Sequence, residues 1–295
     1  MGTMNSPYEL AIAQEDAVLG GFAANLERHL AMIGAARDAG AELCVFPELS
    51  LTGYFLKDLV PELAIRLDDP KLYPLLEQSR RMALVVGLVE ESADHCFYNT
   101  ACFFDGGELV HAHRKIYLPT YGLFEEQRYF ASGRSVRAFD TRLGRFAMLT
   151  CEDMWHAIPP LVAAQDGATQ ILVPSAGPLR GASRRDERLD NGATWEVLNR
   201  FHAKANGVFV AYANRVGVED GVTFGGGSEV VSPSGVSLAR APGLEADLLR
   251  VRIDPAEVRR ERRDSPLYRD ENLDLAIREL IRVRDARLGG GANDR

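Results

Sequence analysis

The stretch Ala147-Met148-Leu149-Thr150-Cys151-Glu152-Asp153-Met154-Trp155 is a short apolar run that ends in a thiol followed by two carboxylates. Residues 145–150 are predicted to form a strand, so Cys151 would lie at the carboxyl end of that strand. Ligands of α/β proteins collect at the carboxyl ends of strands. A buried cysteine is nevertheless more often a packing residue than a nucleophile, so the chemistry depends on what other segments bring to the same place.

The rest of the chain alternates short β-type runs with helical patterns, which predicts an α/β protein. Residues 8–14 form an expected first strand, and residues 22–38 have apolar groups at helical spacing up to a stop at Gly40. Residues 43–46 are expected to form a short buried strand, and Glu48 lies just past its end. Glu48 and Cys151 are therefore both predicted at strand ends.

A third segment is predicted to place a cation, Lys115, at the end of a strand. Residues 97–104 and 109–115 read as a strand pair joined by the turn Asp105-Gly106-Gly107, so Lys115 would end the second strand. Residues 228–251 look like a run of hairpins, and residues 255–263 and 271–285 look helical. No repeat or linker divides the chain. We therefore expect a single domain over residues 1–288 and a disordered tail over residues 289–295.

The composition narrows the class of protein. With 295 residues and 46% hydrophobic content, the chain can bury a large core without disulfides or metal. A net charge of −8 argues against nucleic acid as a partner. Neither a signal peptide nor an apolar run of about 20 residues is present, so we expect a cytoplasmic protein off the membrane. Cys44, Cys96 and Cys102 are interpreted as packing residues.

Together, Glu48, Lys115 and Cys151 supply the parts needed to attack a carbon–nitrogen bond. A cysteine is nucleophilic only as the thiolate, and its ordinary pKa of about 8.5 leaves little thiolate at neutral pH. A carboxylate such as Glu48 can take the thiol proton and later return it to a leaving amine. Lys115 and the backbone N–H of Glu152 could stabilise the oxyanion that forms on the carbonyl. The product would be a thioester that water then hydrolyses.

These segments resemble the nitrilase (carbon–nitrogen hydrolase) superfamily over nearly the whole chain. The resembling motifs are Pro47-Glu48-Leu49 with Thr52-Gly53-Tyr54, Lys115 with Leu118-Pro119, Cys151-Glu152-Asp153 with Trp155, Asn214-Arg215-Val216-Gly217, and Gly226-Gly227-Ser228 with Pro233-Ser234-Gly235. The resemblance implies a four-layer αββα sandwich with Glu48, Lys115 and Cys151 as catalytic triad. It also implies a second glutamate, Glu126, that positions the lysine and the substrate. It implies αββα–αββα dimers and neither a metal nor an organic cofactor.

Within the superfamily, the chain resembles in particular the glutaminase domain of glutamine-dependent NAD synthetases. The similar segments are Lys115 to Glu126, Leu51-Thr52-Gly53-Tyr54 with Asp58-Leu59, and Cys151-Glu152-Asp153-Met154-Trp155. By this resemblance Tyr54, Tyr121 and Phe124 would line the substrate pocket beside Glu126, with Glu152 also facing the substrate. Neither a Ser-Gly-Gly-x-Asp-Ser loop nor a GxxxxGK[ST] loop occurs. We therefore expect either a free-standing amidase or a subunit that passes ammonia to a separate synthetase.

The favoured reading is hydrolysis of a small linear amide to ammonia and a carboxylic acid. Hydrolysis of an N-carbamoyl amino acid or N-carbamoylamine needs the same triad. For the amino-acid substrate, Arg180, Arg184 and Arg185 could hold the carboxylate. A true nitrilase is disfavoured because the Cys-Glu-Asp context resembles the amidase branches. A non-catalytic scaffold is the alternative from another class. Faster alkylation of Cys151 than of the other cysteines would count against it.

Overall fold

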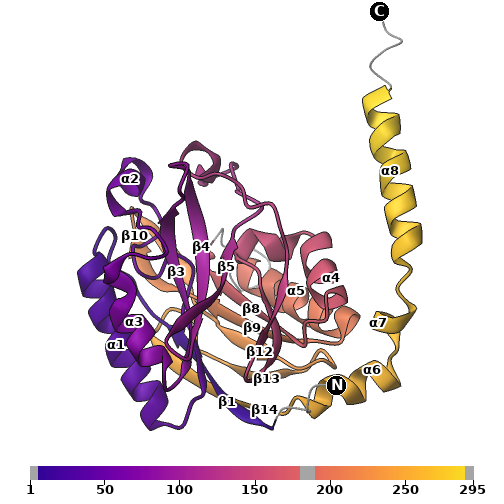
Figure 1. Cartoon of the computed structure of the whole chain (residues 1–295), viewed down its shortest axis with the longest axis horizontal. Helices are drawn as coiled ribbons and strands as arrows, with labels where there is room; N and C mark the ends of the chain where they lie inside the picture. The colour runs from indigo at the N-terminus through magenta and orange to yellow at the C-terminus, as the bar shows by residue number, and fades with distance from the viewer. Residues whose placement is uncertain (1–5, 180–189, 290–295) are drawn as a thin grey trace, which may run out of the picture.

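Two six-stranded mixed sheets stack at the centre of the computed structural model, which describes residues 6–179 and 190–289 (Figure 1). The first sheet has the order β14-β1-β2-β3-β4-β5 and the second β13-β12-β9-β8-β7-β6. The strands of the first sheet are β1 (Tyr8–Gln14), β2 (Leu43–Val45), β3 (Ala83–Glu91), β4 (Phe97–Asp105), β5 (Glu108–Arg114) and β14 (Asp247–Ile253). Those of the second are β6 (Ala138–Thr141), β7 (Gly144–Met148), β8 (Gln170–Ser175), β9 (Phe209–Asn214), β12 (Glu229–Val231) and β13 (Ser237–Arg240). A separate hairpin pairs β10 (Val216–Glu219) with β11 (Val222–Gly225).

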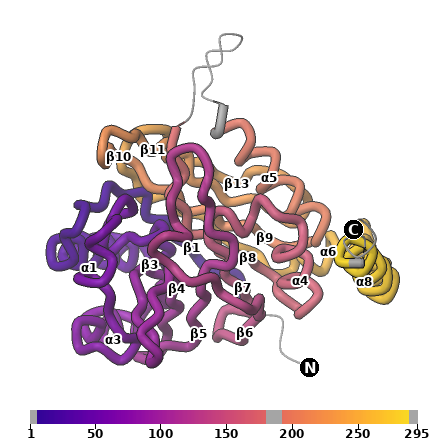
Figure 2. The backbone as a smooth tube through the Cα atoms, turned by 90° about the horizontal axis from the view of Figure 1, so that it is seen from above, coloured from indigo at the N-terminus to yellow at the C-terminus, as the bar shows by residue number. Residues whose placement is uncertain are grey.

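Helices cover the outer faces of the two sheets. The helices α1 (Phe22–Asp38) and α3 (Tyr73–Ser79) lie on the first sheet, and α4 (Ile158–Gln165) and α5 (Asp190–Asn206) lie on the second (Figure 2). Short helical turns occupy η1 (Lys57–Leu59), α2 (Val60–Leu63), η2 (Pro70–Leu72), η3 (Glu126–Arg128) and η4 (Cys151–Trp155). The chain then runs through α6 (Ala256–Asp264), α7 (Leu267–Asp270) and α8 (Leu273–Gly289), which projects away from the sheets (Figure 1). The layers therefore follow one another as helices, sheet, sheet and helices.

Alternation of side chains along the strands explains this layering. In β1, Leu10 and Ile12 face the second sheet, while Ala11 and Ala13 face the α1 side, and all four are fully buried. Successive side chains of a strand point to opposite faces, so a strand covered on both faces must be apolar throughout. The predicted α/β class with stacked sheets is confirmed.

The predicted elements are found with small shifts and one correction. Helix α1 stops before Gly40, whose φ of 86° suits glycine, and β4 pairs antiparallel with β5 as predicted. The run of hairpins expected over residues 228–251 is wrong in part. Strands β12 and β13 form a hairpin, but β14 crosses to the first sheet and pairs with β1. The expected tail falls almost wholly on residues 290–295, outside the described residues.

The strand directions bring the predicted site residues to one rim. Strands β1, β2 and β3 are parallel, and β5 runs the same way because β4 is antiparallel to both of its neighbours. In the second sheet β7, β8 and β9 are parallel. The backbone N–H of Glu48 donates to the carbonyl of Ser175 at 3.4 Å, which joins the carboxyl-end rims of the two sheets. Within the described ranges, no helix is long and apolar enough to span a membrane.

Candidate active site

Glu48 follows β2 by three residues, and its carboxylate is buried and fully engaged. Its Oε1 accepts from Nδ2 of Asn99 at 2.7 Å and from Nζ of Lys115 at 2.7 Å. Its Oε2 accepts from the backbone N–H of Ala176 at 2.8 Å. Three donors from three different segments hold this carboxylate in one orientation, and a carboxylate is a group that can accept a proton from a thiol.

The turn that carries Glu48 depends on a glycine in the neighbouring strand. Leu49 has a φ of 49°, a conformation that L-residues adopt rarely, and Leu51 donates to the carbonyl of Gly87 at 3.1 Å. A Cβ on Gly87 would lie 2.3 Å from the nitrogen of Leu49 and 2.7 Å from the carbonyl oxygen of Pro47. Gly87 therefore permits the turn to lie directly against β3.

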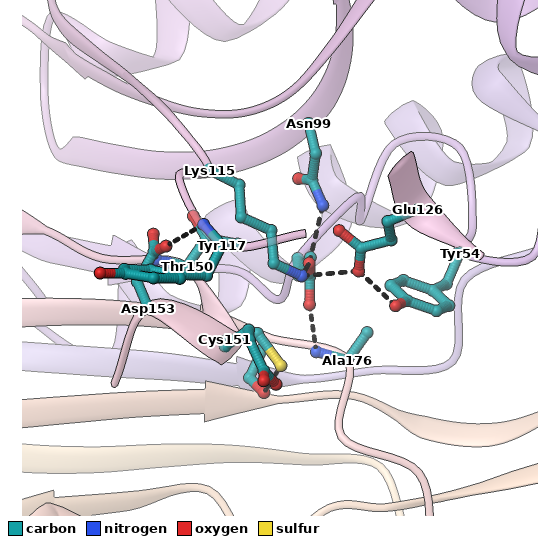
Figure 3. Close-up of polar contacts among 12 residues, drawn as sticks. Tyr54, Asn99, Lys115, Tyr117, Glu126, Thr150, Cys151, Asp153 and Ala176 are labelled. Atoms are coloured by element: carbon teal, nitrogen blue, oxygen red, sulfur yellow. Dashed lines mark hydrogen bonds and ion pairs between the residues drawn. The ribbon is translucent and has the colours of Figure 1, made fainter. Parts of the chain in front are cut away.

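Lys115 is the residue that follows β5, and it is held between two carboxylates. Its Nζ lies 2.7 Å from Oε1 of Glu48, and Lys115 is 1% exposed. The same Nζ lies 2.6 Å from Oε1 of Glu126, and Figure 3 shows the lysine side chain pointing toward that carboxylate. Burial by itself would lower the pKa of Lys115, but the charges of Glu126 and Glu48 outweigh it and hold the pKa well above its usual value. Lys115 is therefore a cation.

Glu126 lies in the turn η3 and completes the buried charge cluster. The hydroxyl of Tyr54 donates to its Oε1, the same oxygen that Lys115 contacts (Figure 3). Burial raises the pKa of Glu126 to about 7, and the positive charge of Lys115 opposes that rise. Its Oε2 is buried and has no hydrogen-bond partner among the described residues. One acceptor oxygen thus remains unused beside the lysine.

Cys151 opens η4 in a left-handed backbone conformation with a φ of 45°. The hydroxyl of Ser175 donates to its Sγ at 3.2 Å. Burial, followed by the charge of Glu48, raises the pKa of Cys151 well above its usual value, and Lys115 opposes the rise. Cys151 is therefore a neutral thiol at rest, and a thiol in this state would need a base during an attack on a substrate.

The four residues predicted to bind substrate form a connected row. The rings of Tyr54 and Phe124 meet edge to face at 6.3 Å, and those of Phe124 and Tyr121 do so at 5.7 Å. The hydroxyl of Tyr121 donates to the carboxylate of Glu152 at 2.9 Å. The row begins at Glu126, because Tyr54 contacts it, and ends next to Cys151, because Glu152 is its neighbour in the chain.

Sequence reasoning missed several polar residues around this cluster. Asn99 has no local signal beyond being a polar residue in an apolar strand, and Ser175 had no assigned role. Asp153 belongs to the Cys151 motif, but it too had no assigned role. The candidate carboxylate-binding residues Arg180, Arg184 and Arg185 lie outside the described residues. In the described part of the chain, no group of three or more His, Cys, Asp or Glu side chains could hold a metal ion.

Comparison with known proteins identifies the family. The carbon–nitrogen hydrolase family model matches residues 9–263. This chain belongs to the carbon–nitrogen hydrolase family. It is accordingly an enzyme of the nitrilase superfamily, and the stacked sheets carrying Glu48, Lys115 and Cys151 are the fold of that superfamily.

The chain is similar to one half of several longer synthetases. A glutamine-dependent NAD(+) synthetase of Thermotoga maritima is 30% identical over 251 residues, covering 83% of this chain and 42% of the relative. A glutamine-dependent NAD(+) synthetase of Xylella fastidiosa is 31% identical over 282 residues, covering 94% of this chain and 49% of the relative. The chain thus spans about half, or less, of the length of these curated relatives.

The solved structures include proteins of matching length. A mutant amidase from Nesterenkonia sp. AN1 superposes with a TM-score of 0.78 at 27% identity, covering 94% of this chain and 99% of the amidase. That structure shows covalent addition of the acetamide moiety of fluoroacetamide at its active-site cysteine. The NAD+ synthetase of Acinetobacter baumannii superposes with a TM-score of 0.76 at 26% identity, covering 86% of this chain and 47% of the synthetase.

Proposed function

We propose that this enzyme hydrolyses the carbon–nitrogen bond of a small linear amide, releasing ammonia and a carboxylic acid through a thioester on Cys151. The observation that carries the proposal is the placement of the Lys115 ammonium between Glu48 and Glu126, at the rim where Cys151 opens the turn η4 after β7. A neutral thiol, an ionised carboxylate and a fixed cation are the groups that amide cleavage requires.

In the first half-reaction the Glu48 carboxylate takes the proton of the Cys151 thiol while Sγ attacks the substrate carbonyl carbon. A carbon–sulfur bond forms, and the negative charge moves to the carbonyl oxygen. The Lys115 ammonium and the backbone N–H of Glu152 would stabilise that oxyanion. Protonated Glu48 then gives its proton to the amide nitrogen, the carbon–nitrogen bond breaks and ammonia leaves.

In the second half-reaction water attacks the thioester with Glu48 again as the base. The carbon–sulfur bond breaks, the acid leaves, and the proton returns to the Cys151 sulfur. The unused Oε2 of Glu126 is positioned to accept an N–H from the substrate amide, which would explain why this buried oxygen has no protein partner. Tyr54, Phe124 and Tyr121 would form the wall that excludes water.

The experiment that tests this function is ammonia release from a substrate panel. The panel contains L-glutamine, L-asparagine, simple aliphatic amides and N-carbamoyl amino acids, assayed with the wild type, Cys151→Ala and the control Cys96→Ala. Turnover of an amide class that is lost in Cys151→Ala and kept in Cys96→Ala supports the proposal. Turnover of N-carbamoyl compounds alone would replace it with the carbamoylase alternative. Absence of turnover by folded protein would favour an ammonia-supplying subunit or a scaffold.

We also propose that the subunits pair through the outer face of the second sheet. Large apolar side chains are exposed there on α4 and α5, including Ile158, Val197 and Phe201, of which Val197 is 66% exposed. Large apolar side chains exposed on two neighbouring helices support an interaction site on this side of the molecule. Sedimentation should give a dimer for the wild type and a monomer for Phe201→Glu. A monomeric wild type would refute the pairing.

A further inference from the structure

The carboxylate of Asp153 is fully buried and accepts hydrogen bonds from two separate segments of the chain. Its Oδ1 accepts from the backbone N–H groups of Ile116 and Tyr117, both at 3.0 Å. Its Oδ2 accepts from the backbone N–H of Thr150 at 3.0 Å and from Nε2 of His113 at 2.8 Å. Because a carboxylate has about four lone-pair sites, Asp153 uses nearly all of them.

The partners of Asp153 are close in the sequence to Lys115 and Cys151, the cation and the thiol of the proposed reaction. His113 precedes Lys115 by two residues, while Ile116 and Tyr117 follow it directly. Asp153 itself lies two residues after Cys151, and Figure 3 shows its side chain between Thr150 and the segment from Lys115 to Tyr117. One carboxylate therefore joins the end of β5 in the first sheet to the turn η4 after β7 in the second.

The same contacts hold the Cys151 turn in its strained form. Cys151 has a φ of 45°, and this left-handed conformation is unfavourable for an L-residue because its Cβ crowds the following carbonyl oxygen. The backbone N–H of Asp153 donates to the carbonyl of Thr150 at 3.0 Å, while the N–H of Thr150 donates to the Asp153 carboxylate. This reciprocal pair closes a ring around Cys151, so the backbone of the nucleophile cannot relax without breaking it.

We propose that Asp153 is a positioning residue that sets the placement of the Lys115 ammonium relative to the Cys151 thiol, with His113 holding the Asp153 carboxylate in place. The proposal rests on the thiol-hydrolase function proposed above. Asp153 acts through backbone groups and has no contact with the reacting atoms. Lys115 follows a strand of the first sheet and Cys151 follows a strand of the second. The Asp153 side chain thereby fixes the position of the Lys115 ammonium relative to the Cys151 Sγ.

Asp153→Asn provides the first test, because an amide replaces one acceptor oxygen with a donor that must face N–H groups. A displacement of about 1 Å of a reacting group can reduce the rate by about 100-fold. We expect kcat to fall tenfold to hundredfold with KM within about twofold, since substrate contacts remain. The matched control is Asp166→Asn, because Asp166 also accepts a backbone N–H, from Ala138 at 2.7 Å, away from the rim.

His113 supplies a second test that does not depend on whether Asp153→Asn folds. His113→Gln keeps an N–H donor toward Asp153, and His113→Leu removes it. We expect near wild-type kcat for His113→Gln and a loss of about fivefold or more for His113→Leu, a difference of about 1 kcal/mol in one hydrogen bond. Iodoacetamide alkylation of Cys151 should slow in parallel with kcat.

Three outcomes separate the two proposals. If wild type turns over an amide and Cys151→Ala does not, the function stands, and Asp153→Asn then decides the positioning role alone. Unchanged kcat in folded Asp153→Asn, or equal kcat in His113→Leu and His113→Gln, would overturn the positioning role of Asp153. A purely structural role would lower the melting temperature of these variants and leave kcat per folded active site unchanged.

Discussion

Nζ of Lys115 lies 2.7 Å from Oε1 of Glu48, and neither side chain is accessible to solvent. Because Oε1 of Glu48 is shared with Asn99 while Oε2 is held by a backbone N–H, the carboxylate has a fixed orientation. A buried ion pair of this kind is weak evidence for stability, because desolvation offsets the attraction between the charges. Its value for the proposed chemistry lies in placing a base and a cation at fixed positions before substrate arrives.

Lys115→Met should abolish most turnover. Removal of one oxyanion donor costs about 100- to 1,000-fold in kcat, and the change also leaves Glu48 and Glu126 as buried carboxylates without their shared cation. We expect the unfolding free energy to fall as well, more at pH 8 than at pH 5.5, because protonation relieves the unpaired carboxylates. The control is Lys57→Met, since Lys57 is half exposed and pairs with Asp220. Turnover by Lys115→Met within tenfold of wild type would contradict the assigned role.

The pH profile should report Glu126. Burial raises its pKa to about 7, so kcat/KM should fall with decreasing pH below about 7 as the carboxylate takes up a proton. The hydrogen bond from Tyr54 favours the ionised form and lowers this pKa, so Tyr54→Phe should move the acid limb to higher pH. Tyr73→Phe serves as control, because Tyr73 is 60% exposed. An acid limb that stays in place in Tyr54→Phe would show that another group controls it.

Gly87→Ala tests the turn that presents Glu48. The added Cβ would lie 2.3 Å from the nitrogen of Leu49, a backbone atom that cannot rotate away. We expect at least a tenfold loss of turnover and a loss of about 1–3 kcal/mol in unfolding free energy. Gly34→Ala in α1 is the matched control, since the added Cβ would meet nothing within 4 Å beyond the adjacent backbone of its own helix, and it should stabilise by about 0.5–1 kcal/mol. Equal activities of the two variants would refute the argument.

Glu15 should make stability depend on pH. Burial raises the pKa of Glu15 to about 8, whereas the unfolded value is about 4.3, so the folded state holds an extra proton between these values. Stability from this group is therefore complete below about pH 4.3 and is lost as pH rises through about 8. Glu15→Gln should flatten this decline in urea unfolding at pH 5.5, 7 and 8.5. The exposed Glu62→Gln should retain the wild-type slope, and the same slope in Glu15→Gln would count against the assignment.

Local patterns predicted much of the fold and part of the site. The hydrophobic periodicity of strands and helices depends on residues that are close in the sequence. It therefore predicted the approximate ends of β2, β5 and β7, which Glu48, Lys115 and Cys151 follow. The assignment of Glu126 came from the family pattern, and the structure places it 2.6 Å from the lysine. Spacing alone could not have joined these residues, because their contacts depend on sheet order.

The missed features are long-range. Strand β14 pairs with β1 at Tyr8 and Ile253, near opposite ends of the chain, and its local pattern resembles that of β13 in the other sheet. Ser175 reaches Cys151 only because β8 lies next to β7, and Asn99 reaches Glu48 only because β4 lies one strand beyond β3. Such partners are set by tertiary pairing, which residue periodicity does not encode.

The most direct test of the central claim is the mass of the Cys151 peptide after acid quenching during turnover of the best amide of the panel. The account predicts an added acyl group on Cys151 that hydroxylamine removes, together with loss of ammonia release in Cys151→Ala. An acyl group on another residue, or undiminished ammonia release by Cys151→Ala, would contradict it.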